Sequence, residues 1–450
     1  MKLKIITNYI VLAFLALQLI SCDNKDSEDA LFDATATERI NARTKELNDA
    51  LKASEFGWKA VYFTDNTQLG GFTHLFKFED GGIVDMASDF DDTSITPEKS
   101  RYSIDIGSTV SLVFTTKNRI HLLSENNVYP TAALVGQGYK GDFQFLYYGQ
   151  ENGQLIFRTN RSFQELRFVR AEAKDWTDLA KNRAMVPNLI GAPTRSVFRF
   201  LETNDGTTVR KYDFNLSALA RFATANSLDA GLNETKAIGI AYTPNGITIS
   251  PAIEVKGQKL TNFIYDGDAT GSFTATGTGG VTASIKYSPS PLIPTDDYKF
   301  LLTTTPPLPS QTFGYIAQFL SAAPTNSVLF KNLAQQLSNA GRAIVRVEFY
   351  FNTAAKQNYV RYQLAGVTYI HVVKVVENAA NKSITLQHDF WAGGITPPLP
   401  SLLALDAQLV STSSTSIPIY VKKESFRITY TNTIYTFANS NGFRITTYQF

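Results

Sequence analysis

Residues 71–86 read GFTHLFKFEDGGIVDM, and this stretch decides the fold class. Aromatic side chains recur at every second position from Phe72 to Phe78, which is the period of a β-strand with one buried face. Asp80-Gly81-Gly82 then supplies the residues of a tight turn, and a second apolar run follows it. The stretch therefore predicts two antiparallel strands joined as a hairpin.

The same alternation continues along most of the chain. Asn152-Gly153 and Asn245-Gly246 separate short apolar runs, and Asn-Gly is a strong hairpin signal because both residues tolerate positive φ. The content of 31 Phe and 21 Tyr against 3 Met also favours pleated sheets over helical bundles. Within the first 170 residues we expect further strands at residues 58–63, 102–106, 110–115, 119–123, 143–148 and 155–158.

Helical spacing is confined to a few places. Ile40, Leu47 and Leu51 recur at multiples of three to four residues with charged residues between them, which is typical of an amphipathic helix. The expected helices cover residues 33–54, 175–185, 312–320 and 326–340. The predicted fold class is α+β: mostly antiparallel β-sheet, with an N-terminal helix and one or two helices that open the C-terminal segment.

Proline-rich breaks divide the chain. Pro187 and Pro193 mark one boundary, and a group of prolines between residues 289 and 309 marks another. The expected parts are a signal peptide at 1–21, an acidic tether at 22–32, an N-terminal β-rich domain at 33–192, a middle β segment at 195–305 and a C-terminal α+β segment at 306–450.

The first residues have the form of a lipoprotein signal peptide. Lys2 and Lys4 precede a mostly apolar stretch at residues 10–19, and Leu-Ile-Ser-Cys ends at Cys22. This pattern predicts cleavage before Cys22 and acylation of its thiol with palmitate-type chains. Two alternatives are a chance cysteine behind an ordinary secretory signal and a transmembrane anchor, but the apolar run is about half of the roughly 20 residues that a spanning helix needs.

The residues after Cys22 indicate where the anchored protein lies. Residues 23–29 read DNKDSED, a polar and acidic stretch that has little to bury and behaves as a flexible tether. Acidic residues at this place resemble the surface-export signal of Bacteroidota lipoproteins. We therefore expect the chain at the outer membrane, held by the Cys22 lipid and facing the extracellular side.

Charge and cysteine usage exclude two classes. Removal of residues 1–21 takes away two lysines and no acids, so the formal net charge of +2 falls to zero. A neutral chain without a basic stripe is not a nucleic-acid binder. With one cysteine there is no intramolecular disulfide, and stability must come from a packed core.

The sequence shows no catalytic constellation, and we predict no catalytic residue, no metal and no cofactor. The four histidines, His74, His121, His371 and His388, fall on expected strands and are read as core or edge residues. The motifs G-x-S-x-G and H-E-x-x-H are absent.

Paired carboxylates are the exception. Asp85, Asp89, Asp91 and Asp92 read as a solvated loop, but a glycosidase needs only two acids from any part of the fold. A hydrolase with dispersed carboxylates that acts on an extracellular polymer therefore stays open as an alternative.

Binding is the remaining class. Sugars are held by exposed aromatic faces and planar polar groups, so the expected ligand-binding residues are Trp391, Trp58 and Tyr265, within a wider set that includes Trp176, Tyr139, Tyr147 and Tyr148. Trp391 stands out because it lies where an expected strand runs into a loop.

Several motifs together resemble a known family. They are Glu55-Phe56-Gly57-Trp58, Gly70-Gly71-Phe72, residues 84–89 (VDMASD), 118–124 (NRIHLLS) and 136–143 (GQGYKGDF). The chain resembles an uncharacterised family of Bacteroidota lipoproteins, a domain of unknown function that would cover nearly the whole mature length. Its members are often encoded beside starch-utilisation-type transporter pairs.

The resemblance implies partners rather than a reaction: a TonB-dependent transporter, a substrate-capturing lipoprotein and a glycan or peptide ligand. We therefore predict a surface-exposed outer-membrane lipoprotein with a non-enzymatic binding or accessory role in nutrient uptake. Beside the hydrolase, a structural or adhesive surface protein is a second alternative.

Overall fold

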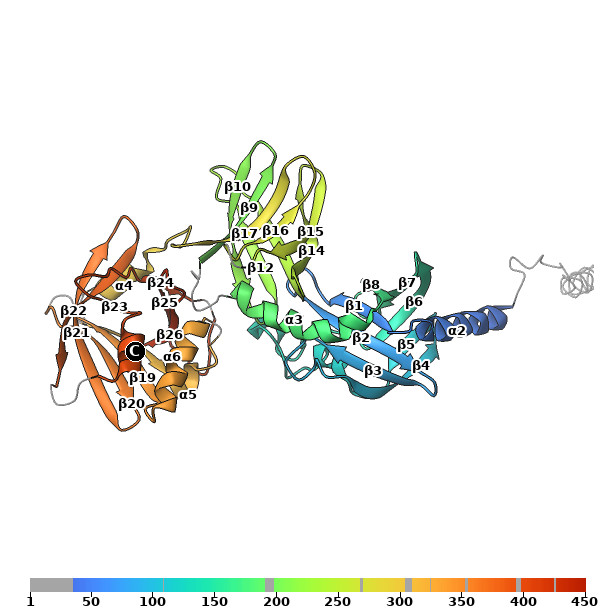
Figure 1. Cartoon of the computed structure of the whole chain (residues 1–450), viewed down its shortest axis with the longest axis horizontal. Helices are drawn as coiled ribbons and strands as arrows, with labels where there is room; N and C mark the ends of the chain where they lie inside the picture. Colours follow the sequence, from blue (N-terminus) through green and yellow to red (C-terminus); the bar gives the residue numbers. More distant parts are fainter. Residues whose placement is uncertain are drawn as a thin grey trace, which may run out of the picture.

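The computed structural model describes residues 35–450, apart from residues 108, 191–197, 268–269, 304–309, 324, 353–354, 394–397 and 425. The signal peptide, Cys22 and the acidic tether lie outside the described residues. Figure 1 shows three successive β-rich lobes, with one helix beside the first of them and another along it.

Helix α2 (Ala36–Lys52) is the expected N-terminal helix. It begins with a capping box: the Thr35 hydroxyl accepts the Glu38 N–H at 3.2 Å, and the Glu38 carboxylate accepts the Thr35 N–H at 2.8 Å. Leu47 and Leu51 on its apolar face are buried among the side chains of the first lobe. The helix is therefore held by its cap and by packing against the sheet.

The first lobe is a closed eight-stranded antiparallel barrel in the order β1 to β8. Its strands are β1 (Trp58–Phe63), β2 (Gly71–Glu79), β3 (Ile83–Ser88), β4 (Glu98–Ile106), β5 (Val110–Phe114), β6 (Gln144–Glu151), β7 (Gln154–Thr159) and β8 (Glu165–Arg170). Strands β2 and β3 are the hairpin expected at residues 71–86. Stacked rings fill the barrel, with Phe76 and Phe168 at 4.7 Å between centroids.

The second lobe is a nine-stranded sheet in the order β10-β9-β17-β16-β15-β14-β13-β12-β11. Its strands are β9 (Phe198–Asp205), β10 (Val209–Asp213), β11 (Asn215–Ser217), β12 (Phe222–Asn226), β13 (Thr235–Thr243), β14 (Gly246–Val255), β15 (Gln258–Tyr265), β16 (Phe273–Thr276) and β17 (Val281–Ser288). A bridge between Tyr212 and Ser227 brings its two ends together. Helix α3 (Ala173–Ile190) leads from the barrel and packs on β13.

The third lobe is a nine-stranded sheet in the order β23-β22-β21-β20-β19-β18-β26-β25-β24. Its strands are β18 (Gln311–Ile316), β19 (Ile344–Phe351), β20 (Asn358–Leu364), β21 (Val367–Asn378), β22 (Ser383–Ala392), β23 (Val410–Ser411), β24 (Tyr420–Lys423), β25 (Ile434–Ala438) and β26 (Arg444–Gln449). A bridge from Ile384 to Ile419 curls it. The helices around it are α4 (Lys299–Leu302), α5 (Ala317–Leu320), α6 (Val328–Asn339) and α7 (Pro400–Asp406).

The α+β class is confirmed: the sheets are antiparallel apart from the parallel pair β22–β23, and helices lie at the N-terminus and around the C-terminal sheet. None of the described helices is both long and apolar enough to span a membrane.

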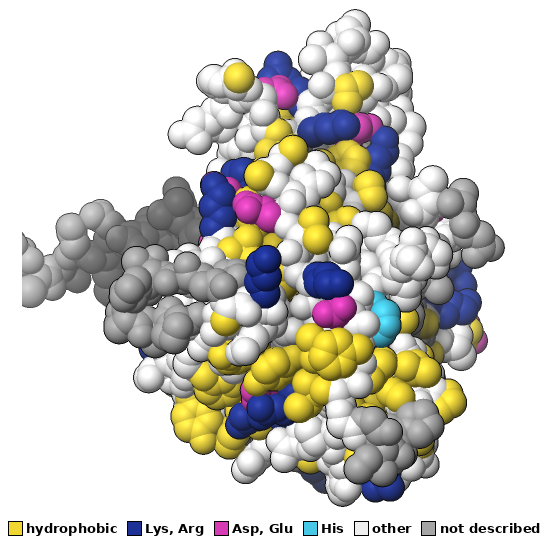
Figure 2. All heavy atoms as spheres, turned by 90° about the vertical axis from the view of Figure 1, so that its left-hand side faces the viewer, with side chains coloured by type: hydrophobic (Ala, Val, Ile, Leu, Met, Phe, Trp, Pro, Cys, Tyr) yellow, Lys and Arg dark blue, Asp and Glu magenta, His cyan; other side chains and the backbone are white. Residues whose placement is uncertain are grey.

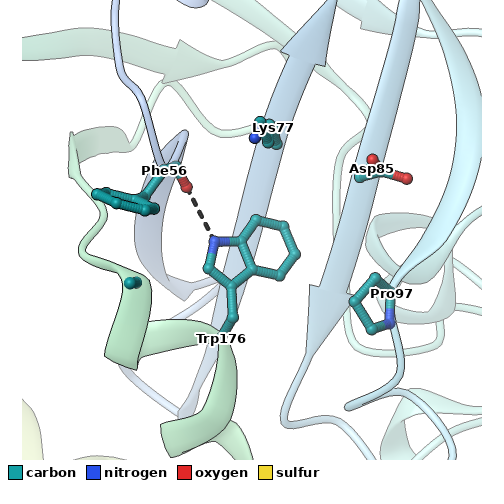
Figure 3. A pocket seen from close by; sticks show the side chains of 6 residues that line it. Phe56, Lys77, Asp85, Pro97 and Trp176 are labelled. Carbon is teal, nitrogen blue, oxygen red and sulfur yellow. Dashed lines mark hydrogen bonds between the residues drawn. The ribbon is translucent and has the colours of Figure 1, made fainter.

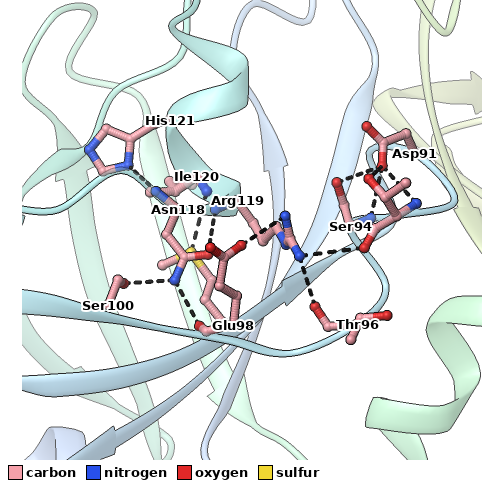
Figure 4. A network of polar contacts seen from close by, with 11 residues as sticks. Asp91, Ser94, Thr96, Glu98, Ser100, Asn118, Arg119, Ile120 and His121 are labelled. Carbon is pink, nitrogen blue, oxygen red and sulfur yellow. Dashed lines mark hydrogen bonds and ion pairs between the residues drawn. The ribbon is translucent and has the colours of Figure 1, made fainter.

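Two local predictions are wrong. Residues 119–123 form a 3-10 helix (Arg119–Leu123) rather than a strand, because the Asn118 side chain caps the helix by accepting the Arg119 backbone N–H. Figure 4 shows this network: the Asn118 amide oxygen accepts the Arg119 N–H at 2.7 Å, and its Nδ2 donates to the Ser100 hydroxyl at 2.7 Å. An Asn side chain that bonds its own backbone competes with a sheet ladder.

The expected helix at 312–320 is mostly strand. Residues 311–316 form β18, which pairs with β19 on one side and β26 on the other, and only Ala317–Leu320 is helical. Phe313 and Tyr315 point into the core as alternate residues of a strand. Pairing on both edges outweighs the local helical spacing.

A buried ion pair joins the barrel to the second sheet. The Arg221 guanidinium lies 2.9 Å from the Asp89 carboxylate, and the two side chains are 5% and 0% exposed. Arg221 also donates to the Gly71 carbonyl at 3.0 Å, and the Asn182 amide of α3 donates to Asp89 at 3.1 Å. We call this joint the Asp89–Arg221 lock.

Candidate functional site

Two of the four histidines serve the fold of the barrel. His74 is fully buried, and burial with the nearby Arg221 lowers its pKa from 6.5 to about 3, so its ring is neutral. His121 accepts the Asn118 N–H on Nδ1 at 3.1 Å and lies 3.2 Å from the Phe114 carbonyl through Nε2. Both ring nitrogens of His121 are therefore occupied by backbone groups.

The acidic cluster after β3 is divided among structural contacts. Asp89 belongs to the Asp89–Arg221 lock. Asp91 accepts the backbone N–H groups of Thr93 and Ser94, and Asp92 pairs with Arg183 of α3 at 2.8 Å. These carboxylates hold the loop and tie it to α3.

The three expected ligand-binding residues lie in three different sheets. Trp58 on β1 is 1% exposed, and its Nε1 donates to the Leu51 carbonyl at 2.8 Å, so it closes the C-terminal turn of α2 and offers no free ring face. Tyr265 at the end of β15 is half-buried against Phe273, at 4.9 Å between ring centroids. Trp391 on β22 is half-buried on the His371 ring. The structure does not bring the three together.

A cleft on the outside of the barrel brings other residues together. It measures about 330 Å³ and is lined by Phe56, Lys77, Asp85, Pro97, Ala173 and Trp176. We call it the Trp176 cleft. Figure 3 shows the indole of Trp176 and the ring of Phe56 on the side of α3, with Lys77 and Asp85 on the strands opposite. The volume is at the lower end of the range of small-ligand pockets.

The aromatic wall is fixed from behind. Trp176 Nε1 donates to the Phe56 carbonyl at 2.9 Å, which sets the plane of the indole. One residue earlier, the Asp175 carboxylate accepts the Glu172 N–H at 2.8 Å and pairs with Lys59 of β1 at 2.6 Å. An acid in the first turn suits the positive end of the helix dipole. These contacts position Trp176 over the barrel wall.

The opposite wall carries one charge of each sign. Lys77 and Asp85 are direct cross-strand partners on β2 and β3. Asp85 lies 3.3 Å from the Lys99 ammonium and keeps 22% of its side chain exposed. Lys77 is exposed and makes no ion pair within the described part of the chain. The cleft therefore combines an aromatic face, a donor and an acceptor.

Sequence reasoning named two members of this cleft as candidates, Trp176 and Asp85, but did not place them together. Trp176 belongs to the wider set of expected aromatics and Asp85 to the acidic cluster, whereas Phe56, Lys77 and Pro97 carried no local signal for ligand binding. The hairpin itself held the missing information, because its turn sets the register that places Lys77 opposite Asp85.

Comparison with known proteins gives the family. The model of a domain of unknown function, DUF4302, matches residues 28–267, which is more than half of the chain. The chain belongs to this family. The DUF4302 match is shorter than the nearly full mature length expected from the sequence: it includes the barrel and the Trp176 cleft, ends within the second lobe and leaves the third lobe outside. No curated protein matches the chain.

Among solved structures, the chain is similar to the isotype 1 transferrin binding protein B from serogroup B Neisseria meningitidis. The sequence identity is 11%, the TM-score is 0.14, and the match spans 84% of this chain and 65% of that protein, so less than two thirds of the neighbour is matched.

Proposed function

We propose that this DUF4302 protein is a lipid-anchored surface protein that binds a glycan in the Trp176 cleft and does not turn it over. The observation that carries the proposal is the pairing of an aromatic wall, Phe56 and Trp176, with Lys77 and Asp85 across a cleft of about 330 Å³. The apolar face of a sugar ring packs on an indole, while its hydroxyls both donate and accept hydrogen bonds.

The size and charge of the cleft restrict the ligand. A space of about 330 Å³ suits one sugar ring or one large amino-acid side chain, so a polymer would enter by one unit. Lys77 donates to a hydroxyl oxygen and Asp85 accepts a hydroxyl proton. Charges of both signs favour a neutral sugar over a strongly charged ligand, and a peptide is the competing outcome of the test.

The location and partners are part of the same proposal. The lipoprotein signal pattern Leu-Ile-Ser-Cys that ends at Cys22 and the acidic residues 23–29 support an outer-membrane anchor with the body facing outwards. The sequence motifs that resemble lipoproteins encoded beside nutrient transporters support the partners, whereas the DUF4302 match gives the family and names no partner. We infer that the protein works beside a TonB-dependent transporter and its substrate-capturing lipoprotein.

A glycan and peptide array with the soluble form, residues 23–450, tests the binding role. Trp176→Ala should abolish binding to the glycans that the unaltered chain retains. Tyr148→Ala is the matched control, because Tyr148 is a 46% exposed aromatic on β6 of the same barrel and lies outside the cleft. Equal loss in both variants would contradict the cleft, and release of products from a bound glycan would support the hydrolase alternative.

Fractionation tests the anchor separately. Cys22→Ala should move the full chain from the outer membrane to soluble fractions. Protease added to intact cells should remove the unaltered protein, because we place it on the outer face. A Cys22→Ala variant that still fractionates with the outer membrane would refute lipid attachment at Cys22.

A further inference from the structure

A chain of hydrogen bonds runs through the third lobe from a buried carboxylate to an exposed histidine. Asp406 at the end of α7 lies 2.8 Å from His371 Nδ1, and His371 Nε2 lies 2.7 Å from His388 Nδ1. His371 and Asp406 are 2% and 6% exposed, whereas His388 is exposed. The three residues come from α7, β21 and β22, and all lie beyond the region of the DUF4302 match.

The proton positions in this chain follow from its buried end. Burial and the Asp406 carboxylate raise the pKa of Tyr362 well above 10, so its hydroxyl keeps its proton and donates to Asp406 at 2.7 Å. Asp406 also accepts the proton on His371 Nδ1, because a carboxylate only accepts. A neutral His371 then accepts at Nε2 from His388 Nδ1–H, which leaves a lone pair on His388 Nε2.

The sheet aims that nitrogen away from the core. A bulge in β22 breaks the register with β21, so that His371 faces Trp391 and Val373 faces His388. The Trp391 indole stacks on His371 at 4.1 Å and 20°, which covers the inner imidazole. Within the described residues, His388 Nε2 has no hydrogen-bond partner. Figure 2 shows a histidine (cyan) at the surface of this lobe, beside an acidic and a basic side chain and at the border of a hydrophobic area.

We propose that His388 is the nucleophile of a second site, and that this site acts on acyl esters. The arrangement is that of an acid–histidine pair behind a nucleophile, with an imidazole as the nucleophile. His371 and Asp406 are positioning residues, because they act on the substrate through His388.

The reaction balances with an ester and water. The Nε2 lone pair attacks the ester carbonyl carbon, and the alcohol part leaves as its anion. His388 passes its Nδ1 proton to His371 Nε2, so the acyl group stays on a neutral imidazole and the positive charge lies beside Asp406. Water then adds to the acyl group and releases the carboxylic acid, His371 returns its proton to His388 Nδ1, and one proton goes to bulk water.

Hydrolysis of p-nitrophenyl acetate by residues 23–450 tests the site, since a phenolate leaves without further assistance. The unaltered chain should exceed His388→Gln in rate, and mass spectrometry of the quenched reaction should find an acetyl group on His388. Asp406→Asn should lower the His388-dependent rate about tenfold or more, because an amide that donates to His371 Nδ1 places a proton on His388 Nε2. The control is His121→Gln, which removes an imidazole of the first lobe and should leave the rate of hydrolysis unchanged.

The readouts separate a relay from a structural role. Near-ultraviolet circular dichroism should show that Asp406→Asn keeps the native packing. If Asp406→Asn loses that packing, His371→Phe breaks the same chain of hydrogen bonds at a second residue. Equal hydrolysis by the unaltered chain and His388→Gln, or full His388 reactivity in both Asp406→Asn and His371→Phe, would overturn the proposal. Neither result bears on glycan binding at the Trp176 cleft.

Discussion

We predict that replacing the Asp89 carboxylate of the Asp89–Arg221 lock with an amide loosens the joint between the barrel and the second sheet. In Asp89→Asn the side chain keeps its shape and loses its charge. The carboxylate now accepts from Arg221, from the Thr73 N–H at 3.1 Å and from the Asn182 amide at 3.1 Å. An Asn amide presents two N–H donors, so it faces at least one of these donors with a donor of its own.

The size of the effect follows from burial. Arg221 is 5% exposed in its side chain, so the substitution leaves a guanidinium in the interior without its counter-charge. Removing one partner of a buried ion pair costs about 3–5 kcal/mol, which corresponds to about two to four powers of ten in an equilibrium constant. We expect this loss in the stability of β2, β12 and β13, the strands around the lock.

Hydrogen–deuterium exchange of the full soluble chain measures that loss strand by strand. Peptides from β2 and β13 should lose protection in Asp89→Asn, while peptides from β19 and β20 of the third lobe serve as the internal reference. Asp49→Asn is the matched control, because Asp49 pairs with Lys45 on the exposed face of α2. This variant should not change the protection measurably. Unchanged protection of β2 and β13 in Asp89→Asn would refute the reasoning.

Three further substitutions test the barrel. The pKa of His74 is about 3 in the folded chain and 6.5 ordinarily, so between these values the unfolded chain binds more protons than the folded one. The free energy of unfolding should therefore fall by about 1.4 kcal/mol for each pH unit below 6.5. In urea unfolding at several pH values, His74→Leu should lack this part of the pH dependence. Trp58→Phe should cost more than about 1 kcal/mol of stability, measured the same way, and leave glycan binding intact, because the bond to the Leu51 carbonyl is lost and the smaller ring leaves part of the buried indole's space empty. Gly70→Ala should lower the thermal midpoint, because its Cβ would lie 2.2 Å from the Arg221 carbonyl oxygen.

The parts of the fold that the sequence predicted are those in which local and long-range preferences agree. The hairpin at 71–86 combines strand alternation with its own turn, and α6 begins at a Ser327 cap, whose hydroxyl accepts the Phe330 N–H at 3.0 Å. Residues 311–316 show the opposite case, because their partners lie in β19 and β26, which are distant in sequence. A prediction from neighbouring residues alone cannot identify strands that pair over such a distance in sequence.

The candidate sites follow the same division. Lys77 and Asp85 were within reach of sequence reasoning, since one turn sets their register. Trp176 reaches them from α3, and only the folded barrel decides which wall that helix covers. His371 and His388 were read as core or edge histidines; a bulge that adds one residue to β22 makes them neighbours, and a carboxylate from α7 bonds His371. Such convergence of separate elements has no local pattern.

The closure of the sheets has a consequence for crowding. The barrel ends where β1 meets β8, and the bridges Tyr212–Ser227 and Ile384–Ile419 curl the other two sheets onto themselves. Molecules tethered to one surface meet at high local concentration, and open strand edges would let neighbouring copies pair through their backbones. Here much of that hydrogen-bonding capacity is already used within the chain. Copies held on one membrane by the proposed Cys22 anchor would therefore present their side chains, rather than their backbones, to one another.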